Sequence, residues 1–190
     1  MALQSIRTLR PVVTREDAIK AFNDGVVGGL RRVALGPLRS VADIYVPFRL
    51  YHVTVGRGRT SETAVLGVDG VTGALDLYRF DTVPGPADLL DVCTRNHVAP
   101  ALSAAAAGEI SASRVKRIVF GRVGFLAAPR VRLDVRPIEG EVHVPYWAGF
   151  FGRTDRASLV VIDAVRRQIE GAKVRRLIDE WLLTDRCRVA

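Results

Sequence analysis

The chain has 190 residues, 48% of them hydrophobic and 25% charged, with a formal net charge of +8. This balance is typical of a folded, soluble domain and excludes a chain that is largely disordered. No apolar run approaches the roughly 18–20 residues needed to span a bilayer, and the N-terminus lacks a secretory signal pattern, so we expect a cytoplasmic protein without a transmembrane segment.

The first expected helix begins at Thr14, whose hydroxyl can cap the first turn. Glu16 and Asp17 follow where the helix dipole favours negative charge. Apolar residues then recur at helical spacing, at Ile19, Phe22, Val26, Leu30 and Val33. Gly36-Pro37 ends the segment.

Three strands rich in β-branched and aromatic residues are expected next, over 44–55, 63–68 and 74–80. Pro47 should lie at an edge or a bulge because it cannot donate a ladder hydrogen bond. Turns at 56–59 and 69–73 separate the strands.

Pro84-Gly85-Pro86 marks a boundary, and a helical region is expected over 87–126, broken by Pro100 and Gly108. Ser111 or Ser113 can cap its last helix. The rest of the chain predicts a strand over 131–136, a turn at Glu139-Gly140, strands over 142–151 and 157–162, and a helix over 173–183. The apolar residues of this last helix should face inward, namely Val174, Leu177, Ile178, Trp181 and Leu182.

The two halves of the chain resemble each other. Val46-Pro47-Phe48 corresponds to Val144-Pro145-Tyr146, and Thr63–Asp69 corresponds to Ala157–Asp163. Gly73 matches Gly171 if the second half carries a short insertion near Arg166. The alternative is chance similarity between two β-rich stretches.

We therefore expect an α+β fold made of two divergent helix-plus-antiparallel-hairpin repeats packed on a shared core. Residues 1–83 form the first repeat, 84–128 a helical connector, and 129–190 the strands and C-terminal helix of the second repeat. Each copy alone has about 80 residues and would be marginally stable, which favours packing on one core.

Pro11–Ala18, followed by a helix and by Tyr45-Val46-Pro47-Phe48, resembles a module of uncharacterised bacterial and archaeal proteins that has a "YxPFW" strand and an "NGxTG" hairpin. Asp69–Gly73 is similar to that hairpin, and Pro145-Tyr146-Trp147 keeps the Trp that Arg49 replaces in the first half. The zinc ribbon often found beside this module is absent. The resemblance implies a fold and a repeat, but no activity.

Candidate chemical groups are few. Cys93 and His97 would share one face of a helix as half of a zinc site, or as a thiol and its base, but they lack paired ligands and an orienting group. His52 and His143 are expected as polar contacts within strands. Asp69 and Asp163 are either an acid–base pair across the repeats or ordinary turn residues, and we favour the turns. We expect no catalytic set, no metal site and no cofactor.

The residues expected to bind partners are Arg57 and Arg59 on a turn, and a group of aromatic residues that we expect to be exposed, namely Tyr146, Trp147, Phe150 and Phe151. These features predict a non-catalytic partner-binding or scaffold subunit of a larger assembly, through a protein partner or self-association. One alternative is a nucleic-acid or anionic-membrane-surface binding protein, given the charge of +8. Another is an enzyme with a site between the repeats.

Overall fold

The computed structural model describes residues 3–24, 29, 33–57, 59–123, 131–152 and 157–189. These residues form an α+β fold, as the sequence predicts, and the chain divides into two compact units. Unit 1 contains residues 1–46, 89–98 and 143–190, and unit 2 contains residues 47–88 and 99–142. The long strands β2 and β6 each contribute to both units.

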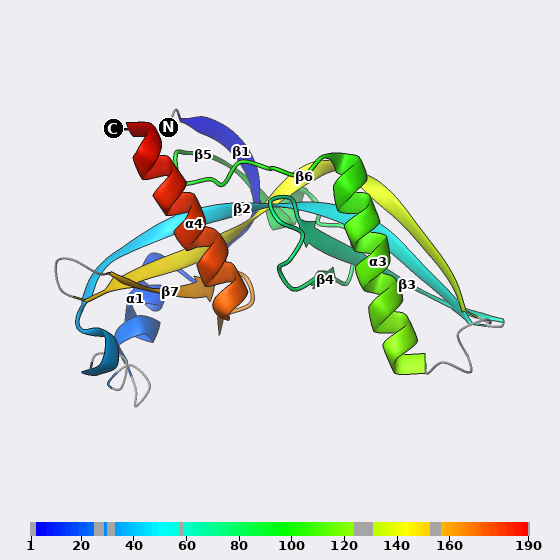
Figure 1. Cartoon of the computed structure of the whole chain (residues 1–190), viewed down its shortest axis with the longest axis horizontal. Helices are drawn as coiled ribbons and strands as arrows, with labels where there is room; N and C mark the ends of the chain where they lie inside the picture. The colour runs from blue at the N-terminus through cyan, green and yellow to red at the C-terminus, as the bar shows by residue number, and fades with distance from the viewer. Residues whose placement is uncertain are drawn as a thin grey trace. The chain divides into compact units, whose positions relative to one another are not determined.

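The elements of the described chain are shown in Figure 1. The strands are β1 (Gln4–Leu9), β2 (Leu38–Arg57), β3 (Thr60–Asp69), β4 (Tyr78–Phe80), β5 (Leu89–Thr94), β6 (Val131–Phe151), β7 (Ser158–Asp163) and β8 (Gln168–Ile169). The helices are α1 (Arg15–Asn23), the short 3-10 helix η1 (Pro86–Asp88), α3 (Ala104–Val123) and α4 (Ala172–Val189).

Among the described residues, unit 1 contains helices α1 and α4 and a set of paired strands in which β1 forms a parallel bridge with β6. β1 pairs antiparallel with β5, while β7 pairs antiparallel with both β6 and β8. Helix α1 begins as expected at Thr14, which forms a capping box with Asp17. Helix α4 lies against β7 and buries Val174, Leu177 and Ile178, as its spacing predicts.

In its described residues, unit 2 contains the β-meander of β2, β3 and β4, the helix α3 and the short helix η1. From Phe48 onwards β2 pairs antiparallel with β3, and β3 pairs with β4. Helix α3 lies against β3 (Figure 1). It is tied to the β3–β4 connection by Arg114, whose guanidinium donates to the carbonyl oxygens of Gly73 and Leu75.

Three local expectations are wrong. Leu89–Thr94 form strand β5 rather than a helix, because their backbone groups pair with β1. The following helix begins earlier than expected, since Ser103 caps it and the alanine-rich start continues through Gly108. No turn interrupts β6 at Glu139-Gly140, because Gly140 takes a positive φ of 95° within the continuous strand.

Each unit has its own hydrophobic cluster. In unit 1 the buried members come from α1 with the segment before it and from β6 and β7 with the residue after it, namely Val13, Ala18, Phe22, Phe151, Val160, Ile162 and Ala164. In unit 2 they come from β2, β3 and α3, namely Tyr51, Val53, Val68, Ala107 and Val115. In both clusters a helix covers a hairpin that lies far from it in the sequence.

Candidate functional site

The turn after β3 is built around a fully buried carboxylate, that of Asp69. Its Oδ1 accepts hydrogen bonds from the amides of Val71, Thr72 and Gly73 and from the Thr72 hydroxyl, at 2.7–3.3 Å. Its Oδ2 accepts from the Leu75 amide at 2.9 Å. This carboxylate therefore holds the turn together, as the preferred reading of the sequence predicts.

The turn after β7 is built in the same way around Asp163, which is also fully buried. Its Oδ1 accepts from the amides two and three residues later, those of Val165 at 2.8 Å and Arg166 at 2.7 Å. The Arg167 amide donates to the Asp163 carbonyl at 3.0 Å. This turn role too is confirmed.

The two turns differ at their fifth residue. Gly73 has a φ of 67°, and the residue in that conformation after Asp163 is Arg167, with a φ of 59°. The expected match of Gly73 with Gly171 is therefore wrong, and no insertion is needed to align the turns. A non-glycine residue with this conformation costs about 1–2 kcal/mol, and Arg167 is the one such residue found in the described chain.

Each turn also holds the segment that leads into a helix. The Gly70 carbonyl accepts hydrogen bonds from the amides of Ala101 and Leu102, both at 2.9 Å. The Ala164 carbonyl accepts from the amides of Val12 and Val13, both at 2.8 Å. Helices α3 and α1 then begin at their capping residues, Ser103 and Thr14.

The space beside the fifth turn residue is filled in unit 2. A Cβ placed on Gly73 would lie 2.8 Å from Ile110 Cδ1 and 3.0 Å from Ile110 Cγ2, so the isoleucine packs directly on the glycine backbone. Ile110 is the seventh residue after the helix cap Ser103, and the seventh residue after Thr14 is Ala21. Unit 1 thus has a small helix residue and a long turn residue where unit 2 has the reverse.

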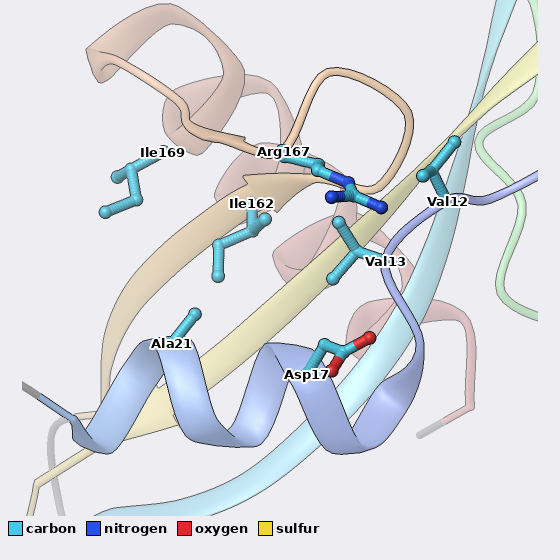
Figure 2. Close-up of a pocket in the computed structure, with 7 residues that line it drawn as sticks. All are labelled: Val12, Val13, Asp17, Ala21, Ile162, Arg167 and Ile169. Atoms are coloured by element: carbon cyan, nitrogen blue, oxygen red, sulfur yellow. The ribbon is translucent and has the colours of Figure 1, made fainter.

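The corresponding space in unit 1 is an open pocket of about 510 Å³. Its lining is mainly aliphatic, with one carboxylate and one guanidinium, and consists of Val12, Val13, Asp17, Ala21, Ile162, Arg167 and Ile169. Figure 2 shows Ala21 and Asp17 on α1, Ile162 above them in this view, and the Arg167 side chain extending toward Val12 and Val13. Two rim residues leave apolar surface in water, since Val12 is 48% exposed and Ile169 is 49% exposed.

The two charged side chains that line the pocket, Asp17 and Arg167, differ in the hydrogen bonds that they form within the described chain. Asp17 accepts hydrogen bonds from the hydroxyl and the amide of Thr14, and these bonds lower the pKa of its carboxyl, with smaller contributions from Lys20 and Arg167. Asp17 is therefore ionised and committed to the helix cap. The exposed Arg167 side chain has no hydrogen bond or ion pair within the described part of the chain.

The aromatic residues expected to bind partners are mostly internal. The expected exposure of Tyr146 and Phe151 is wrong, since both are buried, and Phe151 packs edge-on against Phe22 with ring centroids 5.9 Å apart. Trp147 is half-buried, and its indole N–H donates to the Val13 carbonyl at 2.8 Å. Phe150 is half-buried as well. Their role in partner binding stays a prediction.

Of the two arginines expected at the turn between β2 and β3, Arg59 is exposed. Arg57 ends β2, and its side chain lies outside the described atoms. Whether either residue binds a partner stays a prediction.

Cys93 and His97 do not share a helix face, because Cys93 is exposed in strand β5 and His97 is buried after it. His52 is exposed in β2. His143 is buried in β6, where burial lowers the pKa of its imidazole and the nearby His97 adds to this effect. Across the described residues, no three His, Cys, Asp or Glu side chains come together as metal ligands.

Comparison with known proteins does not extend this description. No protein-family model matches the chain, and neither the curated proteins nor the solved structures hold a significant match. In the described part of the chain, no helix is long and apolar enough to cross a membrane.

The pocket was not predicted from the sequence. The signal that could have identified it is the residue four positions after each turn aspartate. This residue is Gly73 after Asp69 but Arg167 after Asp163. Aligning Gly73 with Gly171 concealed this difference.

Proposed function

We propose that this chain is a non-catalytic protein that binds a segment of a partner protein in the pocket of unit 1, and that its two halves are divergent copies of one module. The observation that carries the proposal is the open pocket itself, because the chain fills the equivalent place in unit 2 with its own Ile110. The duplication supports the proposal by defining which places are equivalent.

Matching hydrogen bonds support the duplication. The Pro47 carbonyl accepts from the Gly70 amide at 2.7 Å, and the Pro145 carbonyl accepts from the Ala164 amide at 3.0 Å. The residue after each proline lies opposite the turn aspartate, with Phe48 paired to Asp69 and Tyr146 paired to Asp163. These contacts join the two motifs that resemble each other in the sequence.

A second set of matches extends the copies to the N-terminal strands. Thr8 of β1 forms a parallel bridge with His143, and His97 after β5 forms a parallel bridge with Tyr45. One copy then runs through β1, α1, β2 and β3, and the other through β5, α3, β6 and β7. Residues 89–123 belong to the second copy in this proposal rather than to a connector.

The cores support an exchange of helices between the copies. Helix α1 of the first copy covers β6 and β7 of the second, whereas α3 of the second copy covers β2 and β3 of the first. Large and small residues also change places between equivalent positions of the two units. A Cβ on Gly149 would lie 2.9 Å from the Phe22 ring, while the equivalent positions in unit 2 are Tyr51 and Ser111. In this proposal each cluster thus contains residues of both copies.

The pocket differs from the Phe22 position, where a large residue in one unit is matched by a small one. At the Phe22 position the large and small residues compensate, because Phe22 contacts Phe151 and is fully buried. At the Ala21 position compensation is incomplete, since Arg167 is exposed and the space beside Ala21 stays open. Apolar residues around an open, concave space are a typical feature of a binding site.

Non-catalytic binding agrees with the use of the buried carboxylates. Oδ1 of Asp69 and Oδ1 of Asp163 each accept hydrogen bonds from turn amides, so these residues serve structure in both units. The pocket itself offers one carboxylate, Asp17, whose hydrogen bonds from Thr14 form a helix cap.

The test is an affinity purification from the protein's own cells with three tagged forms, the wild type, Arg167→Gly, and the double variant Ala21→Ile with Arg167→Gly. The double variant copies the Ile110–Gly73 arrangement of unit 2 and should fill the pocket without disturbing the fold. After nuclease treatment, we expect one protein to be retained in stoichiometric amount by the wild type and lost with the double variant. Equal retention by all three forms, or no retained protein, would contradict the proposal.

A further inference from the structure

The pocket of unit 1 also specifies what kind of segment it takes. We infer that the partner segment presents one branched aliphatic side chain flanked by acidic residues; this rests on the proposed function. The inference combines the shape of the equivalent place in unit 2 with the charges at the pocket.

The aliphatic part of the inference comes from Ile110, which acts as an internal occupant. In unit 2 its Cδ1 and Cγ2 atoms reach the turn backbone at Gly73, and Leu102 lies beside it. In unit 1, the residues that would surround such a side chain are Val13 and Ile162, which are buried, and Arg167. An isoleucine, leucine or valine side chain from outside would therefore meet the kind of surface that already holds Ile110.

The rim of the pocket favours the same type of side chain. Val12 and Ile169 are about half exposed on either side of the pocket, and a docked aliphatic group would remove both from water. The volume of about 510 Å³ also leaves room for residues on both sides of the anchor. The occupant is taken to be a polypeptide segment because the equivalent place in unit 2 is filled by a polypeptide side chain, that of Ile110.

The acidic part of the inference comes from the cations around the pocket. Arg167 forms no close ion pair within the described chain, and both Arg167 and Lys20 attract the Asp17 carboxylate only weakly. Asp17 is the one carboxylate in the lining, and it already accepts hydrogen bonds from Thr14. Of the two charges in the lining, the Arg167 guanidinium is therefore the one that remains available to a carboxylate of a bound segment.

The position of Arg167 strengthens this argument. Glycine takes this conformation without strain, as at Gly73, yet here the chain has an arginine with a φ of 59°. The backbone conformation directs its side chain over Val13 at the mouth of the pocket (Figure 2). A guanidinium held there can form two hydrogen bonds with one carboxylate of a bound segment.

The test uses four synthetic nine-residue peptides and the full-length protein with 13C-labelled methyl groups. The peptides carry a central isoleucine between aspartates and glutamates, a central alanine between the same residues, a central isoleucine between lysines, and a central isoleucine between serines. Methyl spectra report binding at Val12, Val13, Ala21, Ile162 and Ile169. The Ile110 methyl groups of unit 2 serve as an internal control.

We expect the acidic isoleucine peptide to shift the pocket methyl signals and leave Ile110 unchanged. Replacing its isoleucine with alanine should weaken binding about tenfold or more. The serine and lysine peptides should bind about two- to fivefold more weakly at low salt, because exposed ion pairs contribute little. In Arg167→Gly the preference for acidic peptides should disappear while the preference for isoleucine remains, and in the double variant all binding should be lost.

Two results would overturn the inference, namely equal binding of the alanine peptide or binding of the lysine peptide as tight as that of the acidic one. Neither result would affect the proposed function if a cellular partner is still lost with the double variant. Conversely, a partner retained by the double variant would refute docking in this pocket even if the acidic peptide binds.

Discussion

The complementary sizes of Gly73 and Ile110 can be tested by a double-mutant cycle in unit 2. In Gly73→Ala the new Cβ would lie 2.8 Å and 3.0 Å from two Ile110 atoms and 3.3 Å from Leu102 Cδ1. Overpacking of this kind costs about 1–3 kcal/mol, and an L-residue at a φ of 67° costs about 1–2 kcal/mol. We therefore predict a loss of about 2–5 kcal/mol in the free energy of unfolding.

Ile110→Ala removes the side chain that causes this crowding. Since Ile110 is half-buried, its truncation should cost about 1–3 kcal/mol, below the full range for a buried isoleucine. In the double variant the overpacking cost disappears and only the strain and the lost burial remain. The two effects should therefore fall short of additivity by about 1–3 kcal/mol.

The assay is urea unfolding followed by far-UV circular dichroism. Tryptophan fluorescence is a second probe that reports on unit 1, where Trp147 and Trp181 both lie. Gly140→Ala is the matched control. Gly140 has a φ of 95° but nothing within 4 Å of an added Cβ, so it measures strain without crowding. Additivity of Gly73→Ala and Ile110→Ala within about 0.5 kcal/mol would refute the direct packing argument.

Three further predictions concern the turns, the buried histidine and the first helix. Asp69→Ala should cost about 2–6 kcal/mol because it leaves the buried amides of Gly73 and Leu75 without their acceptor, and Asp163→Ala should cost less in the same urea assay, because it removes hydrogen bonds from two half-buried amides. Burial lowers the pKa of His143, so the folded state disfavours the charged imidazole. The free energy of unfolding should therefore not be reduced by His143 above pH 6.5, and it should decline as the pH falls from 6.5 toward the folded pKa. His143→Gln should flatten this decline in urea unfolding measured at successive pH values. Thr14→Ala should cost about 1 kcal/mol and raise the pKa of Asp17 toward its ordinary value, as measured by carboxyl 13C NMR; an unchanged pKa would contradict the capping-box account.

The sequence predicted the start of α1 and the buried face of α4, because both depend on residues close together in the chain. Thr14 and the apolar spacing after it were sufficient for the start of α1, and Val174, Leu177 and Ile178 indicated the buried face of α4. Strand β5 was missed because nothing within residues 89–94 separates a strand from a helix. Its conformation is decided by pairing with β1, which is distant in the sequence.

The candidate site depended on an even less local property. Helix α1 packs on β6 and β7, which lie far from it in the sequence, and this long-range packing brings Ala21 near Ile162 and Arg167. The sequence did indicate that Asp69 and Asp163 are turn residues, because aspartate often accepts hydrogen bonds from the amides that follow it. It did not indicate that Tyr146 and Phe151 are buried, since their exposure depends on what covers both faces of β6.

The most direct test of the account is the affinity of the purified cellular partner for the wild type and for the Ala21→Ile, Arg167→Gly double variant, measured by isothermal titration calorimetry. Arg167→Gly alone serves as the control for charge and backbone strain. We predict a dissociation constant at least about tenfold higher for the double variant, with a free energy of unfolding no lower than that of the wild type. Equal dissociation constants for a folded double variant would contradict the proposal that the pocket of unit 1 binds the partner.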